Sequence, residues 1–244
     1  MNGQSPPLIE LVDVAYAPGG RSVLTGITMS LAQRRIGVVG RNGSGKTTLA
    51  RVMAGLIEPD AGQARIAGVD VARDRKAALG AVGILFQNPD HQIIFPTVEE
   101  EIAFGLTQMG HSGAVVKTGV HAILDRFDKV HWAGAAIHQL SQGQRQLVCL
   151  MSILAMQPRV IILDEPFAGL DIPTTRQLAR VLDGLEVTLV HITHDPDTVR
   201  GYDRVLWLEQ GAVVADGVPD HVLHAFETRM AELGECNDLS DITG

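Results

Sequence analysis

The sequence predicts an α/β fold in which a largely parallel sheet is covered by helices on both faces. Short apolar runs rich in Val and Ile recur along the chain, and helical patterns separate most of them. A block of helical patterns without strong strand signals occupies residues 88–157. Because buried strands of parallel sheets read as continuous apolar runs, we expect one α/β core interrupted by a helical insertion.

The part of the chain before the insertion is predicted to consist mainly of strands. A turn with the sequence "APGGR" joins two predicted strands, and a short buried strand is followed by a helix. A strand pair and a strand ending at Gln87 come next. The expected ranges are 8–16, 22–31, 35–40, 62–71 and 81–87 for the strands, and 46–56 for the helix.

The second part begins with the helical block and then returns to strands. Helical patterns cover residues 97–109, 114–127 and 143–156, and strand patterns cover 159–165, 187–195 and 203–211. Beyond Gly217 we expect one short amphipathic helix and a frayed tail over 234–244.

Composition limits the possible partners. The chain has 244 residues, of which 45% are hydrophobic, and a net charge of −8 without any basic block. With only 4% aromatic residues, nucleic acid is not expected as a partner.

Cys149 and Cys236 imply no disulfide framework. The N-terminus lacks a signal-peptide pattern, and the longest apolar stretch, "LVCLMSILAM", is about half a bilayer span, so we expect a soluble, cytoplasmic chain.

The stretch "GRNGSGKTT" predicts a site for phosphate groups. Residues 40–47 fit the pattern G-x-x-x-x-G-K-[ST] in full. Glycines allow successive N–H groups to point at phosphate oxygens, and the following helix adds its positive end. Lys46 is expected to reach the β- and γ-phosphates, and the Thr47 hydroxyl to ligate Mg²⁺. The candidate ATP-binding residues are Gly40, Asn42, Gly43, Ser44, Gly45, Lys46, Thr47 and Thr48.

An acidic pair after a buried strand completes the prediction of nucleotide hydrolysis. In "RVIILDE", four apolar residues precede Asp164 and Glu165. Asp164 is expected to hold Mg²⁺, directly or through water, and Glu165 to act as general base for the attacking water. An acidic strand end at the surface is the alternative for this pair.

The heptapeptide "LSQGQRQ", residues 140–146, predicts a second anion site at a helix start. Ser141 and Gly143 open the helix, and an ordinary N-cap is the simpler interpretation. Since one nucleotide needs only one such site, a second indicates a phosphate clamped between two surfaces.

Together these motifs resemble the ATPase domain of ABC transporters over residues 8–225. The resemblance implies a P-loop NTPase (RecA-like) core with an antiparallel β subdomain and an inserted α-helical subdomain. It implies a single domain over 1–244, with 1–87 and 158–217 as the nucleotide-binding core, 88–157 as the helical subdomain and 218–244 as a short C-terminal helix and tail.

The same resemblance implies roles for further residues. Tyr16 would stack on adenine, and Gln87 would sense Mg²⁺ and the water. His194 would contact the γ-phosphate, and Asp171 would lie in the D-loop. The signature residues Ser141, Gly143 and Gln144 would bind ATP held by the other subunit of a head-to-tail homodimer. Gln142 departs from the commonest signature, "LSGGQ", which is not expected to abolish activity.

The segment "NPDHQIIFPTVEEEIAFG" after Gln87 resembles the energy-coupling factor (ECF) ATPases, which energise uptake of vitamins and of cobalt or nickel ions. It implies a membrane T component beside this segment, a substrate-binding membrane S component, and a place on the cytoplasmic face of the membrane. Many ECF ATPases have a longer C-terminal region, and a short single ATPase is similar to the biotin-type system. A soluble ABC ATPase, such as one for iron–sulfur cluster assembly, and a regulator without turnover remain alternatives.

Two further groups of polar residues carry expectations. The acidic run Glu99, Glu100 and Glu101 beside apolar residues predicts a groove with acidic edges for a partner helix bearing arginines. His221, His224 and Glu227 share a helix face and are candidate metal ligands, although a solvated face is the favoured interpretation.

Overall fold

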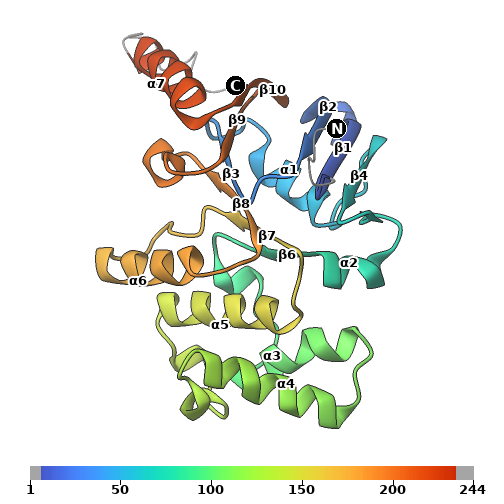
Figure 1. The fold of residues 1–244 in the computed structure, drawn as a ribbon, viewed down its shortest axis with the longest axis vertical. Coiled ribbons are helices and arrows are strands. Elements are labelled where there is room, and N and C mark those ends of the chain that lie inside the picture. Colours follow the sequence, from blue (N-terminus) through green and yellow to red (C-terminus); the bar gives the residue numbers. More distant parts are fainter. Residues whose placement is uncertain (1–6, 235–244) are drawn as a thin grey trace, which may run out of the picture.

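The computed structural model describes residues 7–234, which fold around two β-sheets (Figure 1). A four-stranded antiparallel sheet has the order β2-β1-β4-β5, and a six-stranded sheet has the order β10-β9-β3-β8-β7-β6. Strands β9, β3, β8, β7 and β6 run parallel, and β10 joins the edge antiparallel to β9. The predicted α/β class is therefore confirmed, and so is the antiparallel β subdomain that the family resemblance implied.

The strands begin and end close to the predicted ranges. The antiparallel sheet contains β1 (Ile9–Tyr16), β2 (Leu24–Leu31), β4 (Ala61–Ile66) and β5 (Val69–Asp70). The larger sheet contains β3 (Arg35–Val39), β6 (Val82–Leu85), β7 (Val160–Asp164), β8 (Thr188–Thr193), β9 (Arg204–Glu209) and β10 (Ala212–Gly217).

The helices fall into three groups. Helix α1 (Lys46–Met53) follows β3, and α2 (Arg75–Ala81) precedes β6. The insertion contains α3 (Val98–Gln108), α4 (Gly113–Arg126) and α5 (Gln142–Ala155), and α6 (Ile172–Asp183) follows β7. Helix α7 (Pro219–Gly234) is the predicted C-terminal helix and lies at the end of the molecule opposite α3 and α4 (Figure 1). Most of the predicted tail, residues 235–244, lies outside the described residues.

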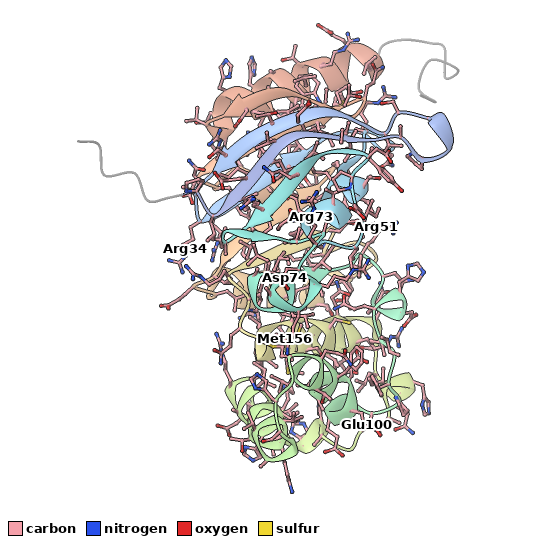
Figure 2. All side chains as sticks on the ribbon, turned by 90° about the vertical axis from the view of Figure 1, so that its right-hand side faces the viewer. Arg34, Arg51, Arg73, Asp74, Glu100 and Met156 are labelled. Carbon is pink, nitrogen blue, oxygen red and sulfur yellow. The ribbon has the colours of Figure 1, made fainter. Side chains whose placement is uncertain are left out.

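Three elements were not predicted, namely α2, α6 and β10. Both helices begin with an aspartate N-cap: Asp74 (Figure 2) accepts a hydrogen bond from the Ala77 amide, and Asp171 accepts one from the Thr174 amide. Strand β10 follows the turn Gln210-Gly211, in which both residues have positive φ, 47° and 77°. Such turns suit antiparallel hairpins, so a local signal existed for each of the three elements.

The parallel sheet is buried on both faces, which explains the continuous apolar runs. Along β7, Ile162 packs with α1 and the antiparallel sheet, whereas Ile161 and Leu163 pack with helices α3, α4, α5 and α6. The helices of the insertion thus share one apolar cluster with the sheet instead of forming a separate core. A third cluster joins α7 to the sheet, where Phe226 meets Trp207 edge to face.

Candidate active site

The glycine-rich loop connects β3 to α1 and forms a backbone cradle. Gly43 and Gly45 have φ values of 82° and 101°, in the region that favours glycine. At Gly40, a Cβ atom would lie 2.2 Å from the Leu208 carbonyl oxygen. The loop therefore needs glycine at these positions, both for its backbone conformation and for its close packing against β9.

Lys46 lies at the centre of the cradle. Its side chain is buried, and Nζ donates to the carbonyl oxygens of Gly40 at 2.7 Å and Arg41 at 2.9 Å. Burial lowers the pKa of Lys46, while the nearby Glu165 and Asp164 carboxylates oppose this shift. The buried Ser44 hydroxyl has no hydrogen-bond partner among residues 7–234. A polyphosphate oxygen fits this donor set, since buried polar groups normally find a partner.

Oxygen atoms suited to a hard cation gather beside the cradle. The Thr47 hydroxyl donates to Oδ1 of Asp164 at 3.2 Å, and Gln87 lines the same cleft. Asp164 is only 4% exposed, and burial raises its pKa. Hydroxyl, carboxylate and amide oxygens are the ligand types that Mg²⁺ takes in proteins, so the residues present fit the predicted metal.

The predicted base and the predicted switch histidine meet at the carboxyl ends of two neighbouring strands. Asp164 on β7 lies opposite Ile192 on β8, so the residues that follow these strands are brought together. Oε1 of Glu165 is 2.8 Å from Nδ1 of His194. Glu165 has a φ of 50°, a conformation that is costly for a non-glycine residue and clusters at functional sites.

The cradle and these side chains line one cleft of about 690 Å³. Ten predicted residues line it: Asn42, Gly43, Ser44, Gly45, Lys46, Thr47, Thr48, Gln87, Glu165 and His194. The cleft is also lined by residues that sequence reasoning missed, namely Arg21, Ser22, Val23, Arg41, Glu209, Gln210 and Gly211. Gly40 instead lines an adjoining pocket that shares Arg41, Asn42 and His194 with the cleft.

Apart from Arg41, which belongs to the cradle itself, the missed residues come from two segments that hold the cradle, 21–23 and 209–211. The Gly211 amide donates to the Ser44 carbonyl at 3.0 Å, and the Gly211 carbonyl accepts from the Thr25 amide at 2.9 Å. The β9–β10 turn thereby connects the phosphate loop to β2. Tyr16 is not among the residues that line the cleft; its side chain packs against the core cluster under the antiparallel sheet.

The signature residues form a second group outside the cleft. Ser141 and Gln144 make a capping box, in which the Ser141 hydroxyl accepts from the Gln144 amide and the Gln144 side chain accepts from the Ser141 amide. A Cβ atom at Gly143 would lie 2.2 Å from Cγ2 of Thr174, so the start of α5 packs tightly against the start of α6. Asp171, the predicted D-loop residue, is the N-cap of α6 and belongs to this second group.

A groove of about 520 Å³ lies on the insertion side of the Gln87 loop. It is lined by Asp90, Ile93, Ile94, Phe95, Pro96, Ile137, His138 and Arg145. The expectation that Glu101 forms a free acidic edge is wrong, because this carboxylate is buried and accepts from the amides of Ile94 and Phe95 at 2.9 and 3.0 Å. Glu100 is exposed among the insertion helices (Figure 2), and the acid that lines the groove is Asp90.

The remaining candidates do not form a metal site or a disulfide among the described residues. Glu227 forms an ion pair with Arg200, and residues 7–234 contain no group of three or more His, Cys, Asp and Glu side chains placed to hold a metal. Cys149 is a free, buried thiol, and Cys236 lies outside the described residues. Within the described part of the chain, no helix combines the length and apolar character of a membrane span.

Comparison with known proteins identifies the family that this chain resembles. Residues 24–168 match the ABC transporter family. The chain is 48% identical to the biotin transport ATP-binding protein BioM of Rhodobacter capsulatus, over 93% of this chain and 99% of that protein. The protein of the same name from Rhizobium etli is 41% identical, over 85% of this chain and 92% of its own length. CbiO1 of Clostridium perfringens, part of the ABC transporter complex CbiONQ, superposes with a TM-score of 0.76 at 29% identity and covers 98% of both chains.

Proposed function

This chain belongs to the ABC transporter family as an ATPase, and we propose that it energises an ECF-type importer whose solute is biotin. The observation that carries the proposal is the similarity to the Rhodobacter protein, which extends over nearly the full length of both chains. The likeness to CbiO1, named as part of a transporter complex, supports the same class of system. Other vitamins, cobalt and nickel are the alternative solutes.

The cleft offers groups suited to binding phosphates and to activating water. In our proposal the loop amides and Lys46 bind the phosphates, and Thr47, Gln87 and Asp164 hold Mg²⁺. The ion supplies positive charge that neutralises the phosphates. Glu165 accepts the proton of the attacking water, and its contact with His194 positions both side chains at the phosphate end of the cleft. Stacking of adenine on Tyr16 remains a prediction, since Tyr16 packs outside the cleft.

A second copy of the chain completes the site in this proposal. Ser141, Gly143, Gln144 and Asp171 lie outside the cleft of their own chain, in the group where α5 meets α6. The positive end of α5 remains a suitable anion site. We place these residues over the ATP of a partner subunit in a head-to-tail homodimer, so that each ATP lies between two chains.

The groove beside Gln87 is the proposed contact with the membrane. Its wall carries Ile94, which is 69% exposed, next to Phe95 and Asp90. An apolar surface with one carboxylate suits a short amphipathic helix bearing an arginine. We assign this groove to a helix of a membrane T component, and biotin binding to a separate S component. The ATPase is then peripheral on the cytoplasmic face of the membrane.

Reconstitution tests this function directly. The chain and the membrane proteins encoded beside its gene are placed in vesicles, and uptake of labelled biotin, Co²⁺ and Ni²⁺ is measured with and without ATP. We expect ATP-dependent biotin uptake that is lost with Glu165→Gln, while biotin binding to the membrane proteins persists. Uptake of Co²⁺ or Ni²⁺ instead of biotin would identify that metal ion as the solute. An active ATPase that never co-purifies with a membrane protein would favour a soluble ABC ATPase.

A further inference from the structure

The start of α5 and the loop after Gln87 are joined by an ion pair that the proposed chemistry does not use. We propose that Asp90 and Arg145 act as a positioning pair, which couples the groove to the signature segment, residues 140–144. The pair itself is observed in the single chain. Its effect on turnover rests on the proposed role of the signature segment in ATP hydrolysis.

Arg145 makes two contacts with one guanidinium group. Its Nε atom lies 2.9 Å from Oδ1 of Asp90, and its Nη1 atom donates to the Leu140 carbonyl at 2.6 Å. Leu140 directly precedes Ser141, the N-cap of α5. Among the described residues Nε has no hydrogen-bond partner, so its contact with Asp90 is an ion pair, and the hydrogen bond of the guanidinium runs from Nη1 to Leu140. Arg145 thus fixes the backbone that presents the signature residues, and Asp90 fixes Arg145.

The loop that carries Asp90 is tied to α5 and is also braced by a hydrogen bond within itself. The Phe86 carbonyl accepts from the buried Gln146 side chain at 3.0 Å, and the Phe86 amide donates to Gln92 at 3.2 Å. Gln146 follows Arg145 on α5. Phe86 directly precedes Gln87, which lines the nucleotide cleft. A displacement of this loop therefore acts on the first turn of α5 through two side chains.

An ordinary surface ion pair is the simpler interpretation, and such pairs contribute about 0–1 kcal/mol. Two features distinguish this one. The Arg145 side chain is only 22% exposed, and its Nη1 hydrogen bond goes to the backbone beside Ser141 instead of to solvent. The Asp90 side chain is 61% exposed and lines the groove together with Arg145. A cationic group in the groove would compete for Asp90 and so alter the restraint on Arg145.

Steady-state ATP hydrolysis by the purified chain tests the pair without any membrane component. The variants are Asp90→Asn, Arg145→Gln and the double variant, with Arg126→Gln on α4 as the matched control. We expect each single variant to lower kcat by roughly 3- to 10-fold and the double variant to fall no further, because the two groups act as one unit. KM for ATP should remain within about twofold, since the phosphate loop is unchanged. Arg145→Lys should fail to restore kcat.

The outcomes distinguish a failure of the Asp90–Arg145 proposal from a failure of the proposed role of the signature segment. Ser141→Arg is measured in parallel, and it should abolish most turnover if the signature segment serves hydrolysis at all. A normal kcat for Ser141→Arg would overturn that role. Loss of activity in Ser141→Arg with a normal kcat in Asp90→Asn, or additive losses in the double variant, would overturn the positioning pair alone. Because Asp90 is mostly exposed, Asp90→Asn decides the question even if Arg145→Gln fails to fold.

Discussion

Nδ1 of His194 lies 2.8 Å from Oε1 of Glu165, although the two residues are far apart in the sequence. Adjacent parallel strands bring them together, because β7 and β8 end at the same edge of the sheet. The same edge carries Asp164 beside the Thr47 hydroxyl. The proposed proton acceptor, the proposed orienting histidine and the oxygens proposed to hold Mg²⁺ therefore meet at one end of the phosphate cradle.

Glu165→Gln should separate nucleotide binding from turnover. The amide retains an oxygen that accepts from His194 but no longer accepts a proton from water, so kcat should fall about 10²- to 10⁴-fold. ATP affinity should be nearly unchanged, because the cradle is intact. Single-turnover hydrolysis and nucleotide binding measure the two effects, with the exposed Glu186→Gln as control. Hydrolysis at the parent rate would remove Glu165 as the base.

Asp164→Asn should stabilise the chain in the absence of nucleotide. The same variant should lose ATPase activity. Burial raises the pKa of Asp164, so the folded state favours the protonated form. The carboxylate then lowers stability as the pH rises through its pKa, and this cost is present at pH 7. Thermal unfolding without Mg²⁺ and ATP should show a higher Tm for the variant at pH 7, and a smaller difference near pH 4. A lower Tm at pH 7 would contradict this explanation.

Glu101→Ala should destabilise the fold instead of weakening partner binding alone. Its carboxylate accepts from the amides of Ile94 and Phe95, and loss of such an acceptor costs about 1–3 kcal/mol. Glu99→Ala, on the exposed face of the same helix, should change the free energy of unfolding by less than about 0.5 kcal/mol. Urea denaturation of both variants makes the comparison. Equal stability of the two variants would show that Glu101 has no such role.

His191 should make stability depend on pH in the mildly acidic range. The side chain is 1% exposed beside Phe167 and Tyr202, and burial lowers its pKa to about 4. In the unfolded chain the His191 side chain becomes protonated near pH 6.5. The stability that the folded state gains from a neutral His191 is therefore fully present above that pH and is lost as the pH falls toward 4. Between pH 7 and 5 the loss should be about 2 kcal/mol.

The variant His191→Phe tests this assignment through the pH dependence and not through stability itself. Packing losses that are independent of pH cancel when denaturation at pH 7 is compared with denaturation at pH 5. The parent and the exposed-site control His121→Gln should lose the same free energy between these two values, and His191→Phe should lose about 2 kcal/mol less. An unaltered pH dependence in His191→Phe would assign the acid sensitivity to other groups.

The sequence by itself determined the features that depend on local chemistry. The glycine pattern of residues 40–47 specifies a cradle because only glycine tolerates its backbone conformation and close contacts. Apolar runs such as 160–163 specify strands buried on both faces. The acidic pair at 164–165 follows one such strand directly. Each of these signals lies within a few consecutive residues, so no knowledge of the remaining chain was needed.

Only the tertiary structure decided which distant side chains share a surface. It placed Arg21, Glu209 and Gly211 around the cleft and Tyr16 outside it. It also turned Glu101 inward to hold two backbone amides, where the acidic run suggested an exposed edge. Helix and strand periods specify the face on which a side chain lies, but the element that covers this face is set by how the chain packs. That packing depends on contacts between segments far apart in the sequence, which no local pattern records.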